Sequence, residues 1–336
     1  MKKRILSGMR PTGPMHIGHL LGALQNWVKL QEEFECLFMV ADWHALMSEY
    51  ENPANIQDNI IEMAADWLGC GIDHKRCTIF VQSAVPQHLE LAMMLSVITP
   101  LSWLERCPTY KEQLREMNPA HARKGGVKGR DLTTYGFLGY PVLQAADILI
   151  YKADTVPVGE DQLAHLELTR EITRRFNGLY KKILVEPHPL LTKTPRILGL
   201  DNRKMSKSYG NFIALADDPD TIRKKVGSMI TDPQRIRMTD KGHPEVCNVF
   251  SYYRIFAPDR EKEVYDWCSN ARKGCTECKA MLAQILIDYL KDIRRKREGL
   301  IKDKKGILRI LEEGNQKARD LASDTLAEVK KAAGML

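Results

Sequence analysis

The chain has 336 residues, of which 44% are hydrophobic, and its 50 basic and 43 acidic side chains give a net charge of +7. This length predicts about two domains with a sizeable buried core. No apolar run reaches the ~18 residues of a membrane span, and no hydrophobic leader follows Met1, so we expect a cytoplasmic protein that does not enter a membrane. The modest basic excess allows a polyanionic partner but does not require one.

A strand, a Gly/Pro loop and a helix start open the chain. Ile5–Ser7 is an apolar run typical of a buried strand, and an amphipathic segment spans residues 20–30. The loop between them would present free backbone N–H groups and the helix dipole to a phosphate. His16 and His19 are three residues apart, so both can face one ligand, and Gly18 leaves room for a nucleotide. The alternative is a capped helix start without a ligand.

Strands and helices alternate over the first hundred residues. Apolar strands are expected at residues 36–42 and 78–83, followed by helices opening at Asn52-Pro53 and at Gln87. Continuous apolar strands separated by helices predict an α/β fold with a doubly wound, Rossmann-like parallel sheet. Only helical patterns follow residue 212. We therefore predict a catalytic domain at 1–212, with a short connecting insertion at about 100–139, and an all-helical domain at 213–336.

A polar stripe marks the middle of the first domain. A helix is expected to begin at Tyr140-Pro141, and Tyr140, Gln144 and Asp147 share one of its faces. A buried hydrogen-bond network is the alternative to the substrate pocket that we favour. A strand from Thr155 then leads to the polar turn Gly159–Gln162 at the same carboxyl edge of the sheet. The charges of the next helix, including His165, Glu167 and Arg170, are expected to form a solvated face.

A second basic motif lies on a loop between Gly199 and Gly210 and reads Lys204-Met205-Ser206-Lys207-Ser208. Two ammonium groups there could follow a pyrophosphate as its charge develops, and the flanking glycines allow the loop to close. Alone, the motif could be a solvated basic turn. HIGH at 16–19 followed by KMSKS at 204–208 resembles the paired signature of class I aminoacyl-tRNA synthetases. Requiring both motifs makes this resemblance specific.

The resemblance narrows to bacterial-type tryptophanyl-tRNA synthetases. GMRPTG at 8–13, YPxxQAADIL at 140–149 and VPVGEDQ at 156–162 are similar to that family, and the similarity covers nearly the whole chain. It implies that Asp147 accepts the indole N–H and that Tyr140 and Gln162 hold the α-amino group. Some members have methionine at Gln144 and Ile-Gln at Met9-Arg10, which leaves the contacts of Gln144 and Arg10 open.

The resemblance also implies residues for ATP and for catalysis. The implied ATP-binding residues are Arg10, Pro11, Thr12, Gly18, His19, Gly159, Glu160, Asp161, Ile197, Lys204, Met205, Ser206, Lys207 and Ser208. The implied catalytic residues are His16, His19, Lys204 and Lys207, with Mg²⁺ shielding the phosphates. These groups would align and stabilise charge rather than act as covalent nucleophiles.

The implied reaction has two steps. ATP activates L-tryptophan to tryptophanyl-adenylate and pyrophosphate, and the aminoacyl group then passes to the 3′-terminal ribose of tRNA(Trp). A fixed acceptor suits indole, whose N–H only donates. Phenylalanine would leave that acceptor unpaired and should therefore be excluded by roughly 10⁴–10⁵-fold. The family forms homodimers and binds the tRNA anticodon with its helical domain. The alternatives are a tyrosyl-tRNA synthetase of the same class, a non-catalytic RNA-binding paralogue and an unrelated nucleotidyltransferase.

The helical domain contains the pattern Cys247-x20-Cys268-x6-Cys275-x2-Cys278. Its spacing indicates a four-cysteine metal site and leaves Zn²⁺ and a [4Fe–4S] cluster open. A subset of the family has a very similar pattern and a [4Fe–4S] cluster, so the resemblance favours the cluster. The basic runs at 294–297 and 302–305 could meet phosphate or form a solvated face. The four other cysteines, at positions 36, 70, 77 and 107, are expected to be isolated core thiols.

Overall fold

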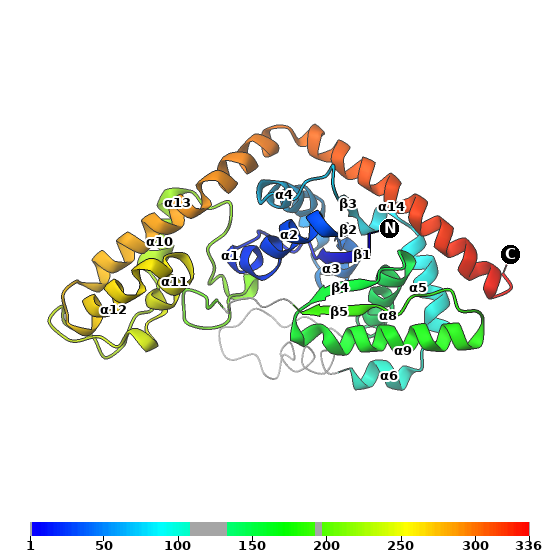
Figure 1. The fold of residues 1–336 in the computed structure, drawn as a ribbon, viewed down its shortest axis with the longest axis horizontal. Helices are drawn as coiled ribbons and strands as arrows, with labels where there is room; N and C mark the ends of the chain where they lie inside the picture. The colour runs from blue at the N-terminus through cyan, green and yellow to red at the C-terminus, as the bar shows by residue number, and fades with distance from the viewer. Residues whose placement is uncertain (1, 108–132, 192–196, 336) are drawn as a thin grey trace.

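The computed structural model describes residues 2–107, 133–191 and 197–335 (Figure 1). Most of the predicted connecting insertion therefore lies outside the described residues, as do the side chains of Asp161 and Ser208. The sheet has five parallel strands in the order β3-β2-β1-β4-β5. They are β1 (Arg4–Met9), β2 (Glu35–Val40), β3 (Thr78–Val81), β4 (Thr155–Val158) and β5 (His188–Leu191). This order confirms the doubly wound fold and puts the switch point of the sheet beside β1.

The helices of the first half follow the strands as expected, with two differences. They are α1 (Ile17–His19), α2 (Gln25–Glu33), α3 (Asp42–Glu49), α4 (Ile56–Gly69), α5 (Gln87–Ile98) and α6 (Leu101–Arg106). Residues Leu20–Leu24 form a π-helical turn that joins α1 to α2. Such turns occur frequently at functional sites. Asn52 does precede a helical segment, the 3₁₀ turn Pro53–Asn55, but its side chain makes no capping hydrogen bond.

Helix α8 (Tyr135–Ile150) begins five residues before the predicted start at Tyr140. Thr134 caps it, because its hydroxyl accepts a hydrogen bond from the backbone N–H of Phe137 at 3.2 Å. Pro141 consequently lies inside the helix, where the prediction had placed it in the first turn. The prediction of a solvated face on α9 (Leu163–Leu179) is wrong for His165, which is buried, whereas Glu167 and Arg170 form an ion pair on the outer surface.

The second half is helical, as predicted. It contains α10 (Pro219–Gly227), α11 (Asn248–Phe256), α12 (Glu261–Ser269), α13 (Cys275–Lys302) and α14 (Lys304–Ala332). The two last helices form a long bent rod along the top of Figure 1 and join at Asp303, whose carboxylate caps α14 through Gly306 N–H. Helix α14 returns to the sheet, where Asn315 Oδ1 accepts a hydrogen bond from Val81 N–H at 2.8 Å. The domain division at residue 212 stays a prediction.

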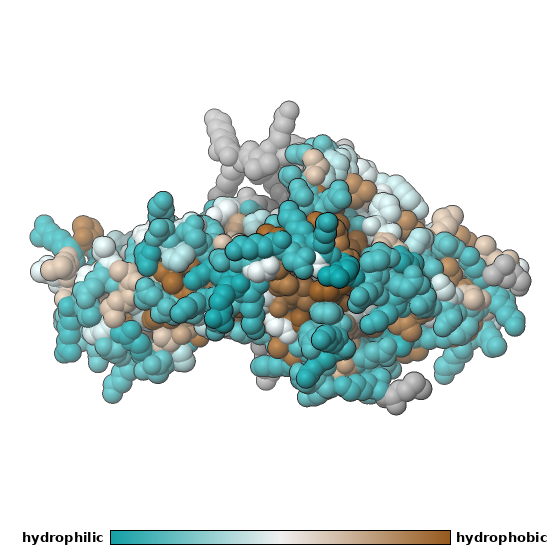
Figure 2. Space-filling model, turned by 90° about the horizontal axis from the view of Figure 1, so that it is seen from above, coloured by the Kyte–Doolittle hydropathy of each residue, from teal (hydrophilic) through white to brown (hydrophobic). Residues whose placement is uncertain are grey.

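Two buried clusters cover the two faces of the sheet. Cys36, Phe38 and Val40 of β2 belong to one cluster, and Leu37 and Met39 to the other. This alternation is what a sheet covered on both faces requires. In the first cluster Trp27 stacks on Phe38 with 4.4 Å between ring centroids. Seen from above α13 and α14, the surface is mostly hydrophilic, with hydrophobic residues gathered near its middle (Figure 2). No helix of the described residues is long and apolar enough to cross a membrane.

Candidate active site

A cavity of about 400 Å³ opens at the carboxyl edge of the sheet. The ends of β1, β2 and β4, the π-helical turn and helix α8 provide its walls, as expected for a ligand site at a switch point. All four residues predicted to bind tryptophan line it, together with two of the predicted ATP residues: Tyr140, Gln144, Asp147, Gln162, Arg10 and Gly159. The structure thus brings together groups that are up to 152 positions apart, from Arg10 to Gln162 (162 − 10).

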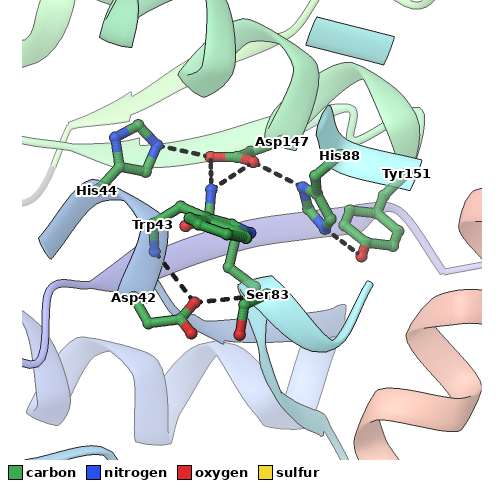
Figure 3. Close-up of polar contacts among 8 residues, drawn as sticks. Asp42, Trp43, His44, Ser83, His88, Asp147 and Tyr151 are labelled. Carbon is green, nitrogen blue, oxygen red and sulfur yellow. Dashed lines mark hydrogen bonds and ion pairs between the residues drawn. The ribbon is translucent and has the colours of Figure 1, made fainter. Parts of the chain in front are cut away.

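Asp147 is the centre of a buried polar network in the wall of this cavity (Figure 3). Its Oδ1 lies 2.6 Å from His88 Nδ1, and its Oδ2 lies 2.8 Å from His44 Nε2. Gln82 Nε2 donates to both oxygens, at 2.8 and 2.9 Å. Burial alone would raise the pKa of Asp147, but the hydrogen bonds from the two histidines offset it and lower the pKa to about 2. The carboxylate is therefore an ionised acceptor at neutral pH.

The partners of Asp147 were absent from the sequence prediction. They come from α3, from the turn after β3 and from α5, and Tyr151 extends the network because its hydroxyl lies 2.7 Å from His88 Nε2. Asp42 fixes the start of α3 by accepting hydrogen bonds from the backbone of Trp43 and Ser83 (Figure 3). The only local signal was Tyr151, four residues after Asp147 on one helix face. The structure thus shows a cavity lined by Tyr140, Gln144 and Asp147 and, in its wall, the buried network that was the stated alternative; the assignment of the cavity to a substrate stays a prediction.

The two signature motifs meet beside this cavity. Lys207 Nζ donates a hydrogen bond to the carbonyl of Gly13 at 2.9 Å. Gly18 is closely surrounded, since a Cβ there would lie 2.9 Å from the His16 ring and 3.3 Å from Met205 Sδ. Asn211 holds the second loop through Ser206 N–H and the carbonyl of Lys204, a role that sequence reasoning missed. The described part of the chain therefore has the second motif folded onto the first.

The two histidines of the first motif are neutral at pH 7. Burial, and then the nearby Lys207 charge, lowers the pKa of His16 to about 4. Burial, His16 and Lys207 lower the pKa of His19 to about 2. His19 Nδ1 accepts the backbone N–H of His16 at 3.2 Å, which leaves the ring proton on Nε2. Both rings are therefore neutral hydrogen-bonding groups, and the positive charge near them comes from Lys207 and Arg10.

The other residues predicted to bind ATP or to act in catalysis differ in how deeply they are buried and in what they contact. Lys204 is exposed, and Met205 is buried against the first motif. Pro11 is buried and Thr12 half-buried in the loop, Glu160 is exposed, and Ile197 packs against the first buried cluster. The structure therefore brings Lys207, but not the side chain of Lys204, into contact with the first motif.

The four cysteines of the helical half line a single small cavity of about 30 Å³. Each is a free thiol, and Arg235 donates toward Cys268 Sγ at 3.9 Å. Burial raises the pKa of Cys247 and Cys268, and raises that of Cys278 to about 12. No three or more His, Cys, Asp or Glu side chains in the described ranges are placed to hold a metal ion. The cysteines thus converge on one cavity without forming a site for one ion.

Of the four cysteines predicted as core thiols, Cys36, Cys77 and Cys107 are buried and Cys70 is half-buried. Cys77 and Cys107 are not isolated: Cys77 Sγ donates to the carbonyl of Asp73 at 3.0 Å, and Cys107 Sγ lies 3.4 Å from His165 Nδ1 at the wall of the cavity. The basic run at 294–297 is also partly internal. Arg294 is buried, and Arg297 forms ion pairs with Glu62 and Asp66 of α4. This run was expected either to meet phosphate or to form a solvated face, and neither Arg294 nor Arg297 is on a solvated face.

A doubly wound parallel sheet in this order, with two signature loops in contact at its carboxyl edge, is the arrangement of a nucleotide-binding α/β domain. The family model described as "tRNA synthetases class I (W and Y)" matches residues 1–291. The chain belongs to this family of class I tRNA synthetases.

The relatives identify the branch of that family. Tryptophan–tRNA ligase of Thermotoga maritima is 47% identical over 336 residues and covers 99% of both chains. The enzyme of the same name from Aquifex aeolicus is 44% identical, covering 98% of this chain and 99% of its own. The crystal structure of tryptophanyl-tRNA synthetase from Campylobacter jejuni with ADP and tryptophan superimposes with a TM-score of 0.88 at 30% identity. It covers 98% of this chain and 99% of its own.

Proposed function

We propose that the chain is a tryptophan–tRNA ligase, and the observation that carries this proposal is the ionised Asp147 carboxylate in the wall of the cavity. An ionised, buried acceptor is suited to reading the indole N–H, which can only donate. The full-length similarity to tryptophan–tRNA ligases supports the same substrate. The enzyme couples L-tryptophan to ATP, releases pyrophosphate and transfers the aminoacyl group to the 3′-terminal ribose of tRNA(Trp).

In the first step, a tryptophan carboxylate oxygen bonds to the α-phosphorus of ATP while the bond from that phosphorus to the pyrophosphate oxygen breaks. His16 and His19 hold the phosphates through neutral N–H groups, and Lys207 stabilises the charge on the departing pyrophosphate. Tyr140 and Gln162 hold the α-ammonium, and Gln144 contacts the substrate beside them. Mg²⁺ bound to the ATP phosphates would shield their negative charge.

The amino-acid assignment is tested by ATP–pyrophosphate exchange with tryptophan, tyrosine or phenylalanine as the only amino acid. We expect exchange with tryptophan alone. Asp147→Asn keeps the size of the side chain but removes the charged acceptor, and should raise KM for tryptophan about 100-fold while KM for ATP stays within about threefold. Faster exchange with tyrosine would favour the tyrosyl alternative. Equal changes in both KM values would contradict the role of Asp147.

We propose further that Cys247, Cys268, Cys275 and Cys278 hold a [4Fe–4S] cluster. Two observations support it: the four thiols line one cavity, and two cations, Arg235 and Lys273, line it with them. Thiolates beside two cations suit an anionic cluster. Zinc would need sulfurs roughly 4 Å apart around one point, and the described residues contain no such group. The cluster would brace residues 231–278 beside the bound tRNA.

Anaerobic purification with iron, sulfide and zinc analysis tests this site. A broad absorbance near 400 nm with about four irons per chain would establish the cluster. Cys278→Ser should abolish both signals, whereas Cys70→Ser, a change outside the four, should leave them intact. Stoichiometric zinc without colour, or neither metal, would overturn the proposal.

We also propose that the enzyme works in the cytoplasm as a homodimer. Leu89, Met93 and Val97 form an exposed apolar stripe on α5, spaced four residues apart. The same helix carries His88, a partner of Asp147, so a second copy on this face would also steady the pocket. Light scattering should give twice the chain mass. Met93→Glu should give a monomer, and Ile236→Glu, on an exposed side chain of the helical half, should not.

A further inference from the structure

Three buried groups from three elements form a chain of contacts behind the amino-acid pocket. Cys107 follows α6, His165 lies on α9 and Tyr140 lies on α8. The Sγ of Cys107 is 3.4 Å from His165 Nδ1, and His165 Nε2 is 2.8 Å from the Tyr140 hydroxyl. His165 and Tyr140 line the cavity, and Cys107 is buried behind them. Both ring nitrogens of His165 are therefore engaged, one by the thiol and one by the phenol.

The chain of contacts has two arrangements of protons. In the first, the thiol donates to Nδ1, Nε2–H donates to the phenol oxygen, and Tyr140 turns its own proton toward the cavity. In the second, the phenol donates to Nε2, Nδ1–H donates to the sulfur, and the oxygen lone pairs of Tyr140 face the cavity. A neutral imidazole carries one N–H, so the two arrangements exclude each other.

An α-ammonium group chooses between them, because it carries only donors. The second arrangement offers it acceptor lone pairs, and the first points a proton at it. Burial raises the pKa of the Tyr140 phenol, so the hydroxyl keeps its proton and needs a hydrogen-bond acceptor other than the ammonium. His165 is the acceptor that lies within hydrogen-bond distance.

We propose that His165, oriented by Cys107, is a positioning residue that turns Tyr140 into an acceptor for the α-ammonium of the substrate. This inference rests on the proposed role of Tyr140 in holding that group. His165 acts through Tyr140 and contributes to the affinity for ammonium-bearing ligands. It has no part in reading the indole ring or in binding ATP.

Three ligands separate this role from a purely structural one. Tryptophan and tryptamine carry the ammonium group, whereas indole-3-propionate keeps the ring and a carboxylate but lacks it. Calorimetry on the full chain gives the affinity of each ligand for the wild type, His165→Asn and His165→Gln. Asparagine reaches the place of Nδ1 only, and glutamine can place its oxygen where Nε2 stands and accept the phenol proton.

We expect His165→Asn to weaken the binding of tryptophan and tryptamine about 10- to 100-fold, the range for a hydrogen bond to a charged group. The affinities for indole-3-propionate and ATP should stay nearly unchanged. His165→Gln should recover most of that loss. Cys107→Val should show the same selectivity to a smaller degree, and Cys107→Ser should behave like the wild type. Parallel losses for all ligands would mean that His165 only supports the fold, and would overturn the proposal.

A double-mutant cycle with Tyr140→Phe separates this inference from the proposed function. If the role of Tyr140 and the positioning role of His165 are both right, Tyr140→Phe weakens the binding of tryptamine. Adding His165→Asn then weakens that binding no further, because the hydroxyl that His165 positions is gone. If Tyr140→Phe leaves tryptamine unchanged, the proposed role of Tyr140 is wrong. If Tyr140→Phe weakens tryptamine but His165→Asn alone does not, only the positioning role is wrong.

Discussion

Lys207 is the one cation that bridges the two signature motifs in the described part of the chain. Burial, and then the charge of Arg10, lowers its pKa from 10.5 to about 8. Most of its charge is therefore present at neutral pH, and the charge is lost at a pH where an exposed lysine would still be charged. This residue is expected to set the alkaline limit of ATP use.

The value of kcat/KM for ATP in pyrophosphate exchange should therefore fall above about pH 8, approaching tenfold per pH unit, since this ratio reports the free enzyme. Lys207→Arg keeps a positive charge at every accessible pH and should move the decline upward. Lys181→Arg, on an exposed side chain to which no role at the site is assigned, should leave the alkaline limb where it is. A wild-type profile that stays flat to about pH 9.5 would refute the assignment.

At the scale of elements, the contact between α14 and β3 depends on a glycine. A Cβ at Gly314 would lie 1.8 Å from the carbonyl oxygen of Ile79, and this obstacle is backbone that cannot swing aside. One residue on, Asn315 bonds the backbone of Val81. The helix therefore lies directly on the edge strand, which it covers in place of a further strand.

Gly314→Ala should lower the free energy of unfolding by about 2 kcal/mol or more, because the helix must move off the strand. Gly299→Ala in α13 is the matched control, since nothing lies within 4 Å of its Cβ position. It should be neutral or stabilise by roughly 0.5–1 kcal/mol through helix propensity. Urea denaturation measures both. Equal effects of the two changes would show that the close approach is not maintained in solution.

At the scale of the whole molecule, a buried ion pair fastens the helical half to the catalytic half. Arg297 of α13 contacts Asp66 of α4 at 2.6 Å and also pairs with Glu62. Burial raises the pKa of Asp66 to about 6 although Arg297 opposes that rise. Asp66 also interacts with the backbone of Met15 in the first signature loop. The pair therefore links α13 to the loop that carries the first signature motif.

Arg297→Gln should cost about 3 kcal/mol at pH 7, because it leaves the Asp66 charge buried without its partner. The folded state keeps the Asp66 proton up to about pH 6 and the unfolded state loses it near pH 4. Stability therefore falls as pH rises through this window, and the loss in the variant should be smaller at pH 5 than at pH 7.

Arg295→Gln is the control, because Arg295 and its partner Asp292 are each 75% exposed. It should change stability by less than about 0.5 kcal/mol at either pH. If Arg297→Gln lost as little stability as Arg295→Gln, helices α13 and α4 would be held together by apolar contacts alone.

The sequence by itself determined the local structure and the class of chemistry. Strands β1 to β4 and the helical second half follow from apolar runs and helical periodicity, which are read within short windows. The resemblance carried by HIGH and KMSKS predicted that these two motifs form one site. The sequence also identified Tyr140, Gln144 and Asp147 as one polar face of a helix. The prediction overlooked one local signal, the cap at Thr134, which lets α8 begin before its proline.

Only the tertiary structure decided which distant groups complete the site. His44, Gln82 and His88 reach Asp147 across 103, 65 and 59 positions. His165, expected in solvent, proved to be buried between Tyr140 and Cys107. The physical reason is that periodicity reports which face of an element a side chain occupies. What that face meets depends on how strands and helices distant in sequence pack together.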